Sequence, residues 1–567
     1  METQRFVWRK IGILTLVLLL ILPTAVWGNE RATNPPATET VALGKPFPWD
    51  RPGAISSRLH LGTPASAGLV KEPLEAIDPA IEEAIQEGYM PGAVVLVARK
   101  GKIVKHEAYG FAAREWDDQG NRMDEPVPMK KDTLFDLASI SKIFTSVAVM
   151  KLYEEGKFRL DDPVAKYIPE FAQKGKAKVT IRQLMTHTSG FEAEIPLHEL
   201  KGSRKDRMQA VFAHSLIHEP GEAYLYSDLN AITLGALVER ISGQRQDVFV
   251  QKYITDPLGM KETMYNPPSS LKSRIAATEY QPKIGRGLVW GSVHDEKAWS
   301  LDGVAGHAGV FSTAKDLAIF AHMLLNHGQY GHVRILKPKT VALMEKNMNI
   351  AFPGDDHGLG WELNQSWYMD ALSDPRTMGH TGYAGTSIVM NRSNGAIAIA
   401  LTNRVHPTRD TPSTNPVRRQ VARLTADAIP VAIPGKGGAW FSGYGDDLDR
   451  SLTGSRWKGT GKRLTFDTWY RMQPAEKGAP TDYGMVEASS DGKHWSAISI
   501  PMSGQSEGWV RKEITLPPHT RSLRFRYHTD DHANGRGWYV KNPKLTDTSG
   551  RTLQVNWSGK GWEQRER

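Results

Sequence analysis

The stretch TLFDLASISKIFTS, residues 133–146, decides how the surrounding chain folds. Its pattern predicts a short extended segment and then a long helix with one apolar face, ending near Gly156. Ser139 stands at the start of this helix and Lys142 three residues on, so both side chains project from one face. A serine hydroxyl becomes nucleophilic when a neighbouring base removes its proton, and a buried lysine can be that base. The free N–H groups of a helix N-terminus can also stabilise an oxyanion.

The Ser-x-x-Lys spacing alone is weak support, because it occurs five times in the chain. The copies begin at Ser139, Ser269, Ser312, Ser455 and Ser490. An ordinary solvated pair explains nearly all of them. Only the first copy opens a strongly apolar helix, so it is the candidate nucleophile.

The amino terminus has the layout of an export signal. Basic residues in the first ten positions precede an apolar run over residues 11–22 and a small-residue region that ends at Gly28. Residues 1–28 are therefore predicted to be a signal peptide or an uncleaved membrane anchor. We expect an extracytoplasmic protein, secreted or anchored at the outer face of a bacterial cytoplasmic membrane.

Length and composition indicate a globular protein of two or three domains. The chain has 567 residues, 40% of them hydrophobic, and no cysteine, which excludes disulfides, thiolate catalysis and Cys-ligated zinc. The net charge of +9 favours an anionic wall polymer or membrane surface, or simply solubility. No DNA- or RNA-binding motif accompanies this charge, so a nucleic-acid partner is not expected.

Composition shifts divide the chain into segments. Pro-rich residues 29–68 are predicted to be a linker before a domain at 69–430, and Gly- and Pro-rich residues 431–448 a second linker. Residues 449–567 hold seven of the sixteen tryptophans and short strand-like runs, a pattern typical of a β-sandwich.

The domain at 69–430 is predicted to be α+β, an antiparallel sheet flanked by helices, because its strands come in hairpins and not in βαβ units. The two hairpins are expected at residues 93–111 and 387–401. Besides the Ser139 helix, helices are expected at residues 74–86, 180–185, 231–241, 314–325 and 416–428. In the sandwich, strands are expected at residues 464–470, 485–488, 509–516, 523–527 and 538–540.

Two later motifs can complete a site around Ser139. Tyr226 and Asp228 stand in a loop before a helix, where a tyrosine hydroxyl can relay a proton. His380, Thr381 and Gly382 open a strand, where a substrate backbone can approach the glycine closely. Each motif alone is better explained as a core tyrosine, a surface histidine or a strand glycine. Their joint occurrence in this order favours one cleft.

Ser-x-x-Lys, Tyr-x-Asp and His-Thr-Gly in this order resemble the serine β-lactamase and penicillin-binding protein superfamily, class C type. The resemblance covers residues 65–428 and includes the runs at 160–164 and 184–190. Residues 293–298 and 306–309 resemble most closely the class C-type penicillin-binding carboxypeptidases and the exported muramoyl-alanine amidases.

The resemblance implies roles for these residues. Ser139 is implied to be the nucleophile that forms an acyl-enzyme, with Lys142 and Tyr226 sharing the base and acid steps. Asp228 stands beside Lys142 in place of the usual Asn. Because a carboxylate there would hold the Lys142 proton more tightly, it argues against an efficient β-lactamase.

The third motif is implied to form the opposite edge of the cleft. His380, Thr381 and Gly382 would line this edge, and the N–H groups of Ser139 and Tyr383 would form the oxyanion hole. His380 replaces the usual Lys and removes a permanent cation from the presumed carboxylate-binding edge. Acyl transfer on a peptide or ester remains compatible with both departures.

Other catalytic patterns are weaker. Residues 504–508 match the G-x-S-x-G elbow, but they form a turn between strands and no helix follows. No His-Glu-x-x-His motif is present. His294, Asp295, Glu296 and His307 could ligate a metal, although hydrogen bonding in a Gly-rich loop is the favoured interpretation. We expect no metal and no other cofactor in catalysis.

The C-terminal region resembles the jelly-roll sandwich of secreted immune-inhibitor-A-like peptidases. The matching runs are residues 489–495, 523–527 and 534–539. Asp530 and Asp531 could hold a structural calcium ion or cap a loop. By analogy, contact with wall or glycan is the expected role of this domain.

The leading hypothesis is an exported serine hydrolase that forms an acyl-enzyme on peptidoglycan-type peptides or muropeptides, like a D-alanyl-D-alanine carboxypeptidase. The alternatives are an N-acetylmuramoyl-L-alanine amidase, a small-ester esterase and a weak β-lactamase. A penicillin-binding wall receptor is the non-enzyme alternative. The oligomeric state is left open.

Overall fold

The protein is described from a computed structural model. The described residues are 39–42, 53–475, 478–506, 508–531 and 535–566. The predicted signal or anchor, residues 1–28, lies outside them. Within these ranges no helix combines the length and apolar character needed to cross a bilayer.

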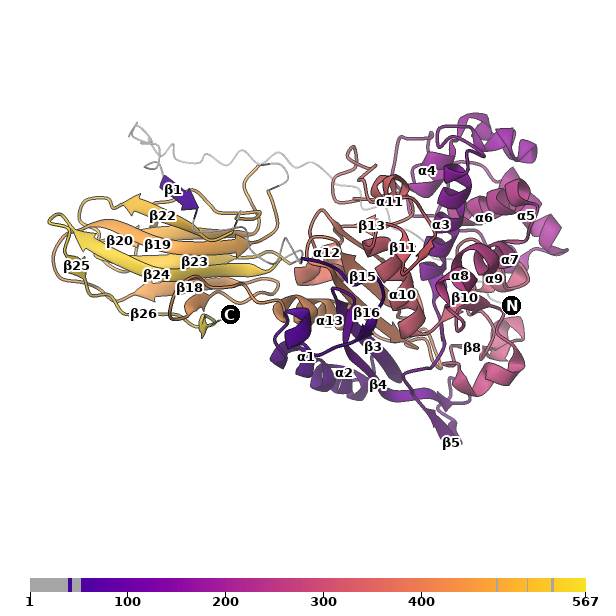
Figure 1. Ribbon diagram of the computed structural model, residues 1–567, viewed down its shortest axis with the longest axis horizontal. Coiled ribbons are helices and arrows are strands. Elements are labelled where there is room, and N and C mark those ends of the chain that lie inside the picture. The colour runs from indigo at the N-terminus through magenta and orange to yellow at the C-terminus, as the bar shows by residue number, and fades with distance from the viewer. Residues whose placement is uncertain (1–38, 43–52, 476–477, 507, 532–534, 567) are drawn as a thin grey trace, which may run out of the picture.

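An antiparallel sheet forms the centre of the first domain (Figure 1). Strand β3 is buried along its whole length, and its alternate residues enter two different cores. Val94 and Leu96 belong to one hydrophobic cluster, and Val95 and Val97 to the other. Both sheet faces are therefore covered. In spatial order the strands are β13 (Glu362–Leu363), β14 (Thr377–Thr381), β15 (Ser387–Asn391), β16 (Ala396–Thr402), β3 (Gly92–Arg99), β4 (Lys102–Glu115) and β2 (His60–Leu61), with β5 (Arg122–Pro128) also paired to β4.

Helices cover the two faces of this sheet. Helix α10 contacts β3 and β16 from one side, and α13 contacts β16 and α2 on the other. The helices are α1 (Glu72–Glu75), α2 (Ile77–Gln86), α3 (Ser141–Glu154), α4 (Ile181–Met185), α5 (Arg204–Ala213), α6 (Asp228–Ser242), α7 (Gln246–Val250), α8 (Asp256–Leu258), α9 (Glu296–Ser300), α10 (Ala314–Leu325), α11 (Pro338–Met344), α12 (Ser366–Met369) and α13 (Asn415–Asp427). Short strand pairs complete the domain: β6 (Phe135–Asp136) and β7 (Met264–Tyr265) on β10 (Val310–Ser312), β8 (Tyr280–Gln281) with β9 (Gly287–Leu288), and β11 (Gln329–Tyr330) with β12 (Val333–Arg334).

Helix α3 is buried on all sides, not on one face as its sequence predicts. Eleven of its fourteen residues are buried. Its polar side chains tolerate this because they are hydrogen-bonded: Thr145 Oγ1 donates to Gly306 O over 2.7 Å, and Ser141 Oγ accepts from Val310 N over 3.0 Å. Ser139 precedes the helix in a 3₁₀ turn at Ala138–Ile140.

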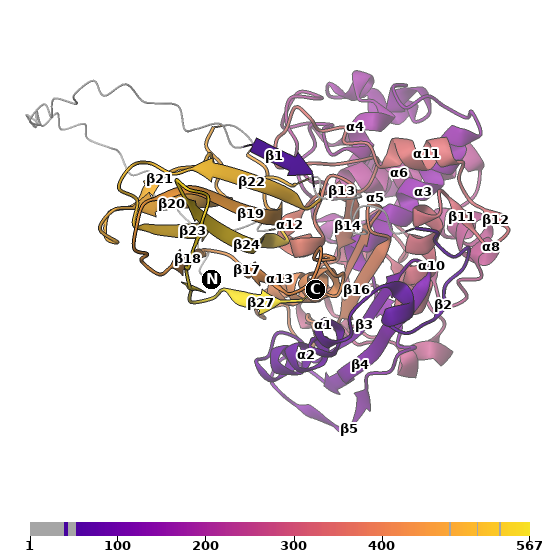
Figure 2. The same cartoon turned by 60° about the vertical axis from the view of Figure 1, so that its left-hand side comes forward.

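The C-terminal region is a sandwich of two antiparallel sheets, which confirms the predicted all-β fold (Figure 2). Its core includes Trp457, Phe466, Phe525 and Trp538. The larger sheet holds β1 (Glu39–Ala42), β22 (Val510–Thr515), β19 (Gly461–Arg471), β24 (Gly537–Asp547), β17 (Ala439–Phe441), β27 (Glu563–Arg565) and β25 (Thr552–Leu553). The smaller sheet holds β21 (Ser496–Ala497), β20 (Tyr483–Ser489), β23 (Ser522–His528), β18 (Asp449–Gly454) and β26 (Trp557–Ser558).

Both segments predicted as linkers carry strands. In the segment 29–68, β1 pairs with β22 of the sandwich and β2 pairs in parallel with β4. In the segment 431–448, β17 pairs with β24 and β27. Figures 1 and 2 both show β1 beside β22, far along the chain from its neighbours in sequence. The amino-terminal segment therefore spans both domains.

The sandwich packs against α13. Val421 of α13 lies in one hydrophobic cluster with Phe441 and Tyr539 of the sandwich. Asp427 at the end of α13 pairs with Arg536 over 2.9 Å and with Arg565 over 2.6 Å. Because the Arg536 side chain is only 1% exposed, the ion pairs lie inside the interface.

Candidate active site

The turn before Ser139 has an unusual backbone. Ala138 has a φ of 48°, a left-handed conformation that is uncommon for alanine. Its N–H donates to Asp136 Oδ1 over 2.8 Å, and the adjoining Leu137 carbonyl accepts from Thr386 Oγ1 over 3.1 Å. These bonds hold the turn that presents Ser139.

Gly382 is required by close packing against this turn. A Cβ there would lie 2.1 Å from Thr386 Oγ1 and 2.4 Å from Leu137 O. The glycine therefore brings the end of β14 against the nucleophile turn, whereas the sequence predicted an approach by substrate. Arg418 of α13 donates to the carbonyls of Gly382 and Thr386 over 2.6 and 3.1 Å, which holds this edge from behind.

Ser139, Lys142 and Asp228 lie in one row. Lys142 Nζ donates to Ser139 Oγ over 2.9 Å and lies 2.8 Å from Asp228 Oδ1. Its side chain is 4% exposed. Burial favours the neutral amine, but the carboxylate of Asp228 outweighs burial and raises the pKa of Lys142 above its usual value. Lys142 therefore rests as an ammonium, as the Asp-for-Asn replacement predicted.

Tyr226 lies over Lys142, held by a histidine that the sequence had not singled out. The Lys142 ammonium is 4.8 Å from the centroid of the Tyr226 ring, and the His187 ring stacks on the Tyr226 ring with the two centroids 4.6 Å apart. His187 Nδ1 accepts from the N–H of Ser227 over 3.0 Å. Burial lowers the pKa of His187, so it acts as a neutral positioning group. Burial also raises the pKa of Tyr226, and the charge of Lys142 offsets this only in part.

The residues of the third motif and the adjoining Tyr383 lie partly in the cleft and partly in the interior. Tyr383 lines the cleft and is 51% exposed. His380 is buried with its ring 6.0 Å from that of Tyr226, and Thr381 is half-buried at the end of β14. Burial lowers the pKa of His380 to about 3, so the ring is neutral at physiological pH. Neither His380 nor Thr381 belongs to the described residues that line the cleft.

Two backbone amides are available for an oxyanion. Among the described residues, the N–H groups of Ser139 and Tyr383 have no hydrogen-bond partner. Both residues line the same cleft, which has a volume of about 630 Å³. Free donors beside a nucleophile are the arrangement that stabilises a tetrahedral intermediate.

A second lysine extends the charge row. Lys297 Nζ lies 3.4 Å from Asp228 Oδ2, 3.0 Å from Asp295 Oδ2 and 2.5 Å from Glu194 Oε2. Asp295 Oδ1 also bonds His307 Nε2 over 2.8 Å. Burial opposes the charges, but the neighbouring carboxylates raise the pKa of Lys297 and the neighbouring cations lower the pKa of Asp295.

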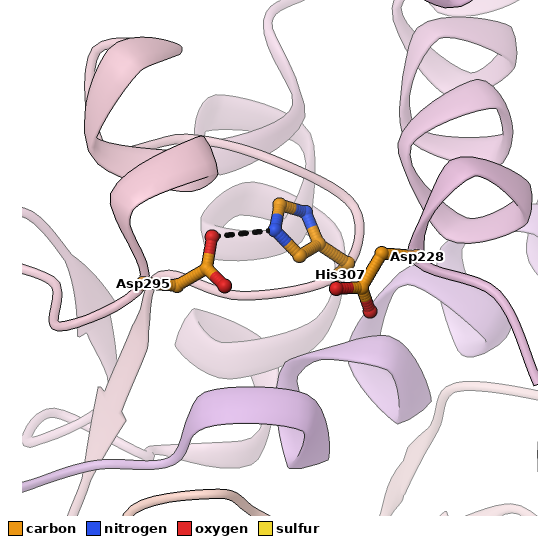
Figure 3. A group of neighbouring side chains, drawn as sticks. All are labelled: Asp228, Asp295 and His307. Carbon is orange, nitrogen blue, oxygen red and sulfur yellow. Dashed lines mark hydrogen bonds and ion pairs between the residues drawn. The ribbon is translucent and has the colours of Figure 1, made fainter. Parts of the chain in front are cut away.

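Asp228, Asp295 and His307 are the candidate metal ligands (Figure 3). Their ligand atoms lie within 4.8 Å of one another, the one such group among the described residues. Lys142 and Lys297 already neutralise the two carboxylates, so the donor set fits an ion-pair network better than a cation site. Metal-free catalysis stays a prediction, as does calcium at Asp530 and Asp531.

Residues 77–423, more than half of the chain, match the family model described as Beta-lactamase. The chain belongs to the beta-lactamase family. This confirms the predicted superfamily and fold, and with the Ser139–Lys142 pair it identifies a serine hydrolase.

Curated relatives and solved structures agree with the family. Proteins named "Putative D-alanyl-D-alanine carboxypeptidase" from Salmonella agona (strain SL483) and Salmonella enteritidis PT4 (strain P125109) are 34% identical over 390 residues, covering 63% of this chain and 89% of each relative. The solved structure titled "EstCE1, a hydrolase with promiscuous acyltransferase activity" has a TM-score of 0.51 at 24% identity, covering 62% of this chain and 98% of its own. A penicillin-binding protein homologue from Caulobacter crescentus has a TM-score of 0.50 at 19% identity, covering 64% and 99%. At these identities the two structures show the fold alone.

Proposed function

We propose that this serine hydrolase is a D-alanyl-D-alanine carboxypeptidase that acts on peptidoglycan-type peptides. The observation that carries the proposal is the convergence of Ser139 Oγ, Lys142 Nζ and two unpartnered amides in one cleft. The names of the curated relatives support the substrate class.

The geometry supports the following sequence of steps. Ser139 Oγ bonds to the carbonyl carbon of the penultimate D-alanine, and its proton passes to the Lys142–Tyr226 pair. The N–H groups of Ser139 and Tyr383 bind the oxyanion. The C–N bond then breaks, and the nitrogen of the leaving D-alanine takes the proton. Water hydrolyses the ester of Ser139, with the same pair moving its proton.

The resting protonation state limits this reaction. Because Asp228 keeps Lys142 as an ammonium, the pair must lose a proton before it can accept one from Ser139. The reactive form is therefore a minor one at neutral pH. This supports slow acyl transfer over the efficient turnover of a β-lactamase.

We also propose that the reaction takes place outside the cytoplasm. The support is the basic and apolar pattern of residues 1–28. Fractionation of cells that express the full chain should place it in the extracytoplasmic fraction, and recovery of unprocessed protein in the cytoplasm would contradict export. Amino-terminal sequencing distinguishes a cleaved signal from an anchor.

Mass spectrometry tests the activity. The full chain is incubated with a labelled penicillin and then with an N-acyl peptide that ends in D-alanyl-D-alanine. We expect a penicilloyl adduct on Ser139 and released D-alanine, with both lost in Ser139→Ala. Equal cleavage by both proteins without a serine adduct would refute the mechanism. Release of a peptide with a free amino-terminal L-alanine from muropeptides would indicate the amidase instead.

A further inference from the structure

The Lys297 ammonium lines the cleft and is surrounded by three carboxylates. Its side chain is 11% exposed, and its oxygen partners belong to Asp228, Asp295 and Glu194. An ammonium group has three N–H donors, so three carboxylate partners leave Lys297 no free donor. A substrate carboxylate can reach Lys297 only if one of these partners leaves.

Two of the three partners are fixed in place. Asp228 is bound to Lys142, and its own N–H donates to Ala193 O over 2.8 Å. Asp295 caps α9 by accepting from Ala298 N over 2.7 Å, while its carboxylate also bonds His307. Displacing either one would leave a buried charge without its partners.

Glu194 differs from the other two partners. Its side chain is 62% exposed, and among the described residues only Lys297 contacts its carboxylate. The backbone just before it is held, because the carbonyls of Glu192 and Ala193 accept from Ser227 Oγ and Asp228 N. A side-chain rotation alone therefore releases Lys297, and the freed carboxylate enters water at little cost.

Charge counting gives the same answer. Two ammonium groups, Lys142 and Lys297, face three carboxylates here, and Glu194 is the one of the three that is largely exposed. A substrate carboxylate in its place would leave the local charge unchanged. His380, which stands in place of the usual lysine, is neutral and buried. Arg409, the arginine among the residues that line the cleft, is paired with both Glu279 and Glu296.

We propose that Lys297 is the carboxylate-binding residue of the cleft, and that Glu194 occupies this subsite until a substrate carboxylate displaces it. The inference rests on the proposed function only for the class of substrate. Wall peptides carry a carboxylate at the C-terminus and another on the γ-linked D-glutamyl residue, and either has the required chemistry. A charge-assisted hydrogen bond to Lys297 should favour the carboxylate over an amide by about 10- to 100-fold.

Calorimetric binding to the full chain tests this subsite without turnover. All variants carry Ser139→Ala. The first probe pair is N-acetyl-D-alanyl-D-alanine and its C-terminal amide. The second is L-alanyl-γ-D-glutamyl-L-lysyl-D-alanyl-D-alanine amide and its D-isoglutamine form. We expect one acid to bind about 10- to 100-fold more tightly than its amide, and that pair shows which carboxylate is recognised.

The variants separate binding from folding. Lys297→Met should reduce the acid-to-amide ratio to about 1, and Lys297→Arg should retain most of it. Glu194→Gln should tighten the acid several-fold without tightening the amide. Lys283→Met and Glu199→Gln, both at exposed positions, are the matched controls. If Lys297→Met does not fold, Lys297→Arg and Glu194→Gln still test whether Lys297 binds the carboxylate.

Specific results would overturn the proposal. They are an unchanged ratio in Lys297→Met, equal binding of both acids and amides to the parent, or weaker acid binding in Glu194→Gln. Failure of the proposed function would look different. In that case the protein with Ser139 would form no acyl-serine and release no D-alanine, whatever the binding ratios.

Discussion

Replacing Asp228 with asparagine tests how the resting charge of the site limits its rate. Asp228 Oδ1 lies 2.8 Å from Lys142 Nζ, and the side chains of Lys142 and Asp228 are 4% and 14% exposed. At an effective dielectric constant of 20, two unit charges at this distance attract by about 6 kcal/mol, which corresponds to about four pKa units. Asparagine keeps a hydrogen-bond acceptor, so we expect the pKa of Lys142 to fall by about one to three units.

The expected result is a faster reaction at neutral pH. The rate rises with pH as Lys142 deprotonates, so a lower pKa shifts the rising limb of the pH–rate profile to lower pH by about one to three units. A base with a lower pKa accepts the Ser139 proton less readily, which offsets part of this shift. The acylation rate at pH 7 should therefore rise by about 3- to 30-fold. The assay is penicillin acylation followed by stopped-flow between pH 5 and pH 11.

A control variant separates the Lys142 effect from a general change in charge. Glu194→Gln also removes one negative charge from the network, but Glu194 contacts Lys297 and not Lys142. Its profile should shift less than that of Asp228→Asn. A limb that stays in place in Asp228→Asn, or that moves to higher pH, would refute the assignment of Asp228 as the group that holds the Lys142 proton.

Three further predictions concern packing and stability. Gly382→Ala, whose Cβ would meet Thr386 and Leu137, should lower acylation at least 100-fold and unfolding stability by about 1–3 kcal/mol, measured by penicillin labelling and urea denaturation. Burial raises the pKa of Asp482 to about 7, so the folded state loses stability as the pH rises from about 4 to about 7, and the loss is complete above that range. Asp482→Asn should therefore be near neutral at pH 4 and stabilise by up to about 4 kcal/mol at pH 8 in urea denaturation. Residues 53–436 alone should aggregate on expression, because α13 loses its cover; a monodisperse, penicillin-binding fragment would contradict this.

The sequence predicts the central residues of the site because few types of enzyme use the Ser-x-x-Lys and Tyr-x-Asp motifs in this order. Ser139, Lys142, Tyr226 and Asp228 meet as the motif order predicts. The consequence of the Asp-for-Asn replacement also follows from elementary electrostatics, since a buried carboxylate beside an ammonium raises its pKa.

The position of His380 did not follow from its motif. A strand of alternating residues presents two faces, and the motif does not say which face carries the cleft. In the structure His380 is buried, with its ring 6.0 Å from that of Tyr226, while Tyr383 reaches the cleft. The part played by Lys297 was missed for a related reason. The run at residues 294–297 was conspicuous, but only the fold brings it beside Asp228.

The strands in the two predicted linkers are too short to be recognised in the sequence. β2 has two residues and β17 has three, fewer than the run over which a period-two alternation can be recognised, and β1 has only four. Their partners are distant as well: His60 pairs with Lys102, and Trp440 with Val540. Proline and glycine content therefore predicted linkers where pairing across long separations forms sheet.

Helix α13 joins the catalytic cleft to the sandwich. Near its start, Arg418 holds the carbonyl of Gly382 beside the nucleophile turn, and at its end Asp427 pairs with Arg536 and Arg565. Breaking a buried pair such as Asp427–Arg536 would leave an uncompensated charge, so the two domains resist separation. If the sandwich contacts wall polymer, as the analogy with related domains implies, that contact holds the cleft in a fixed orientation to the polymer. The rigid joint then restricts which peptides reach Ser139, whereas a flexible tether would let the domain search freely.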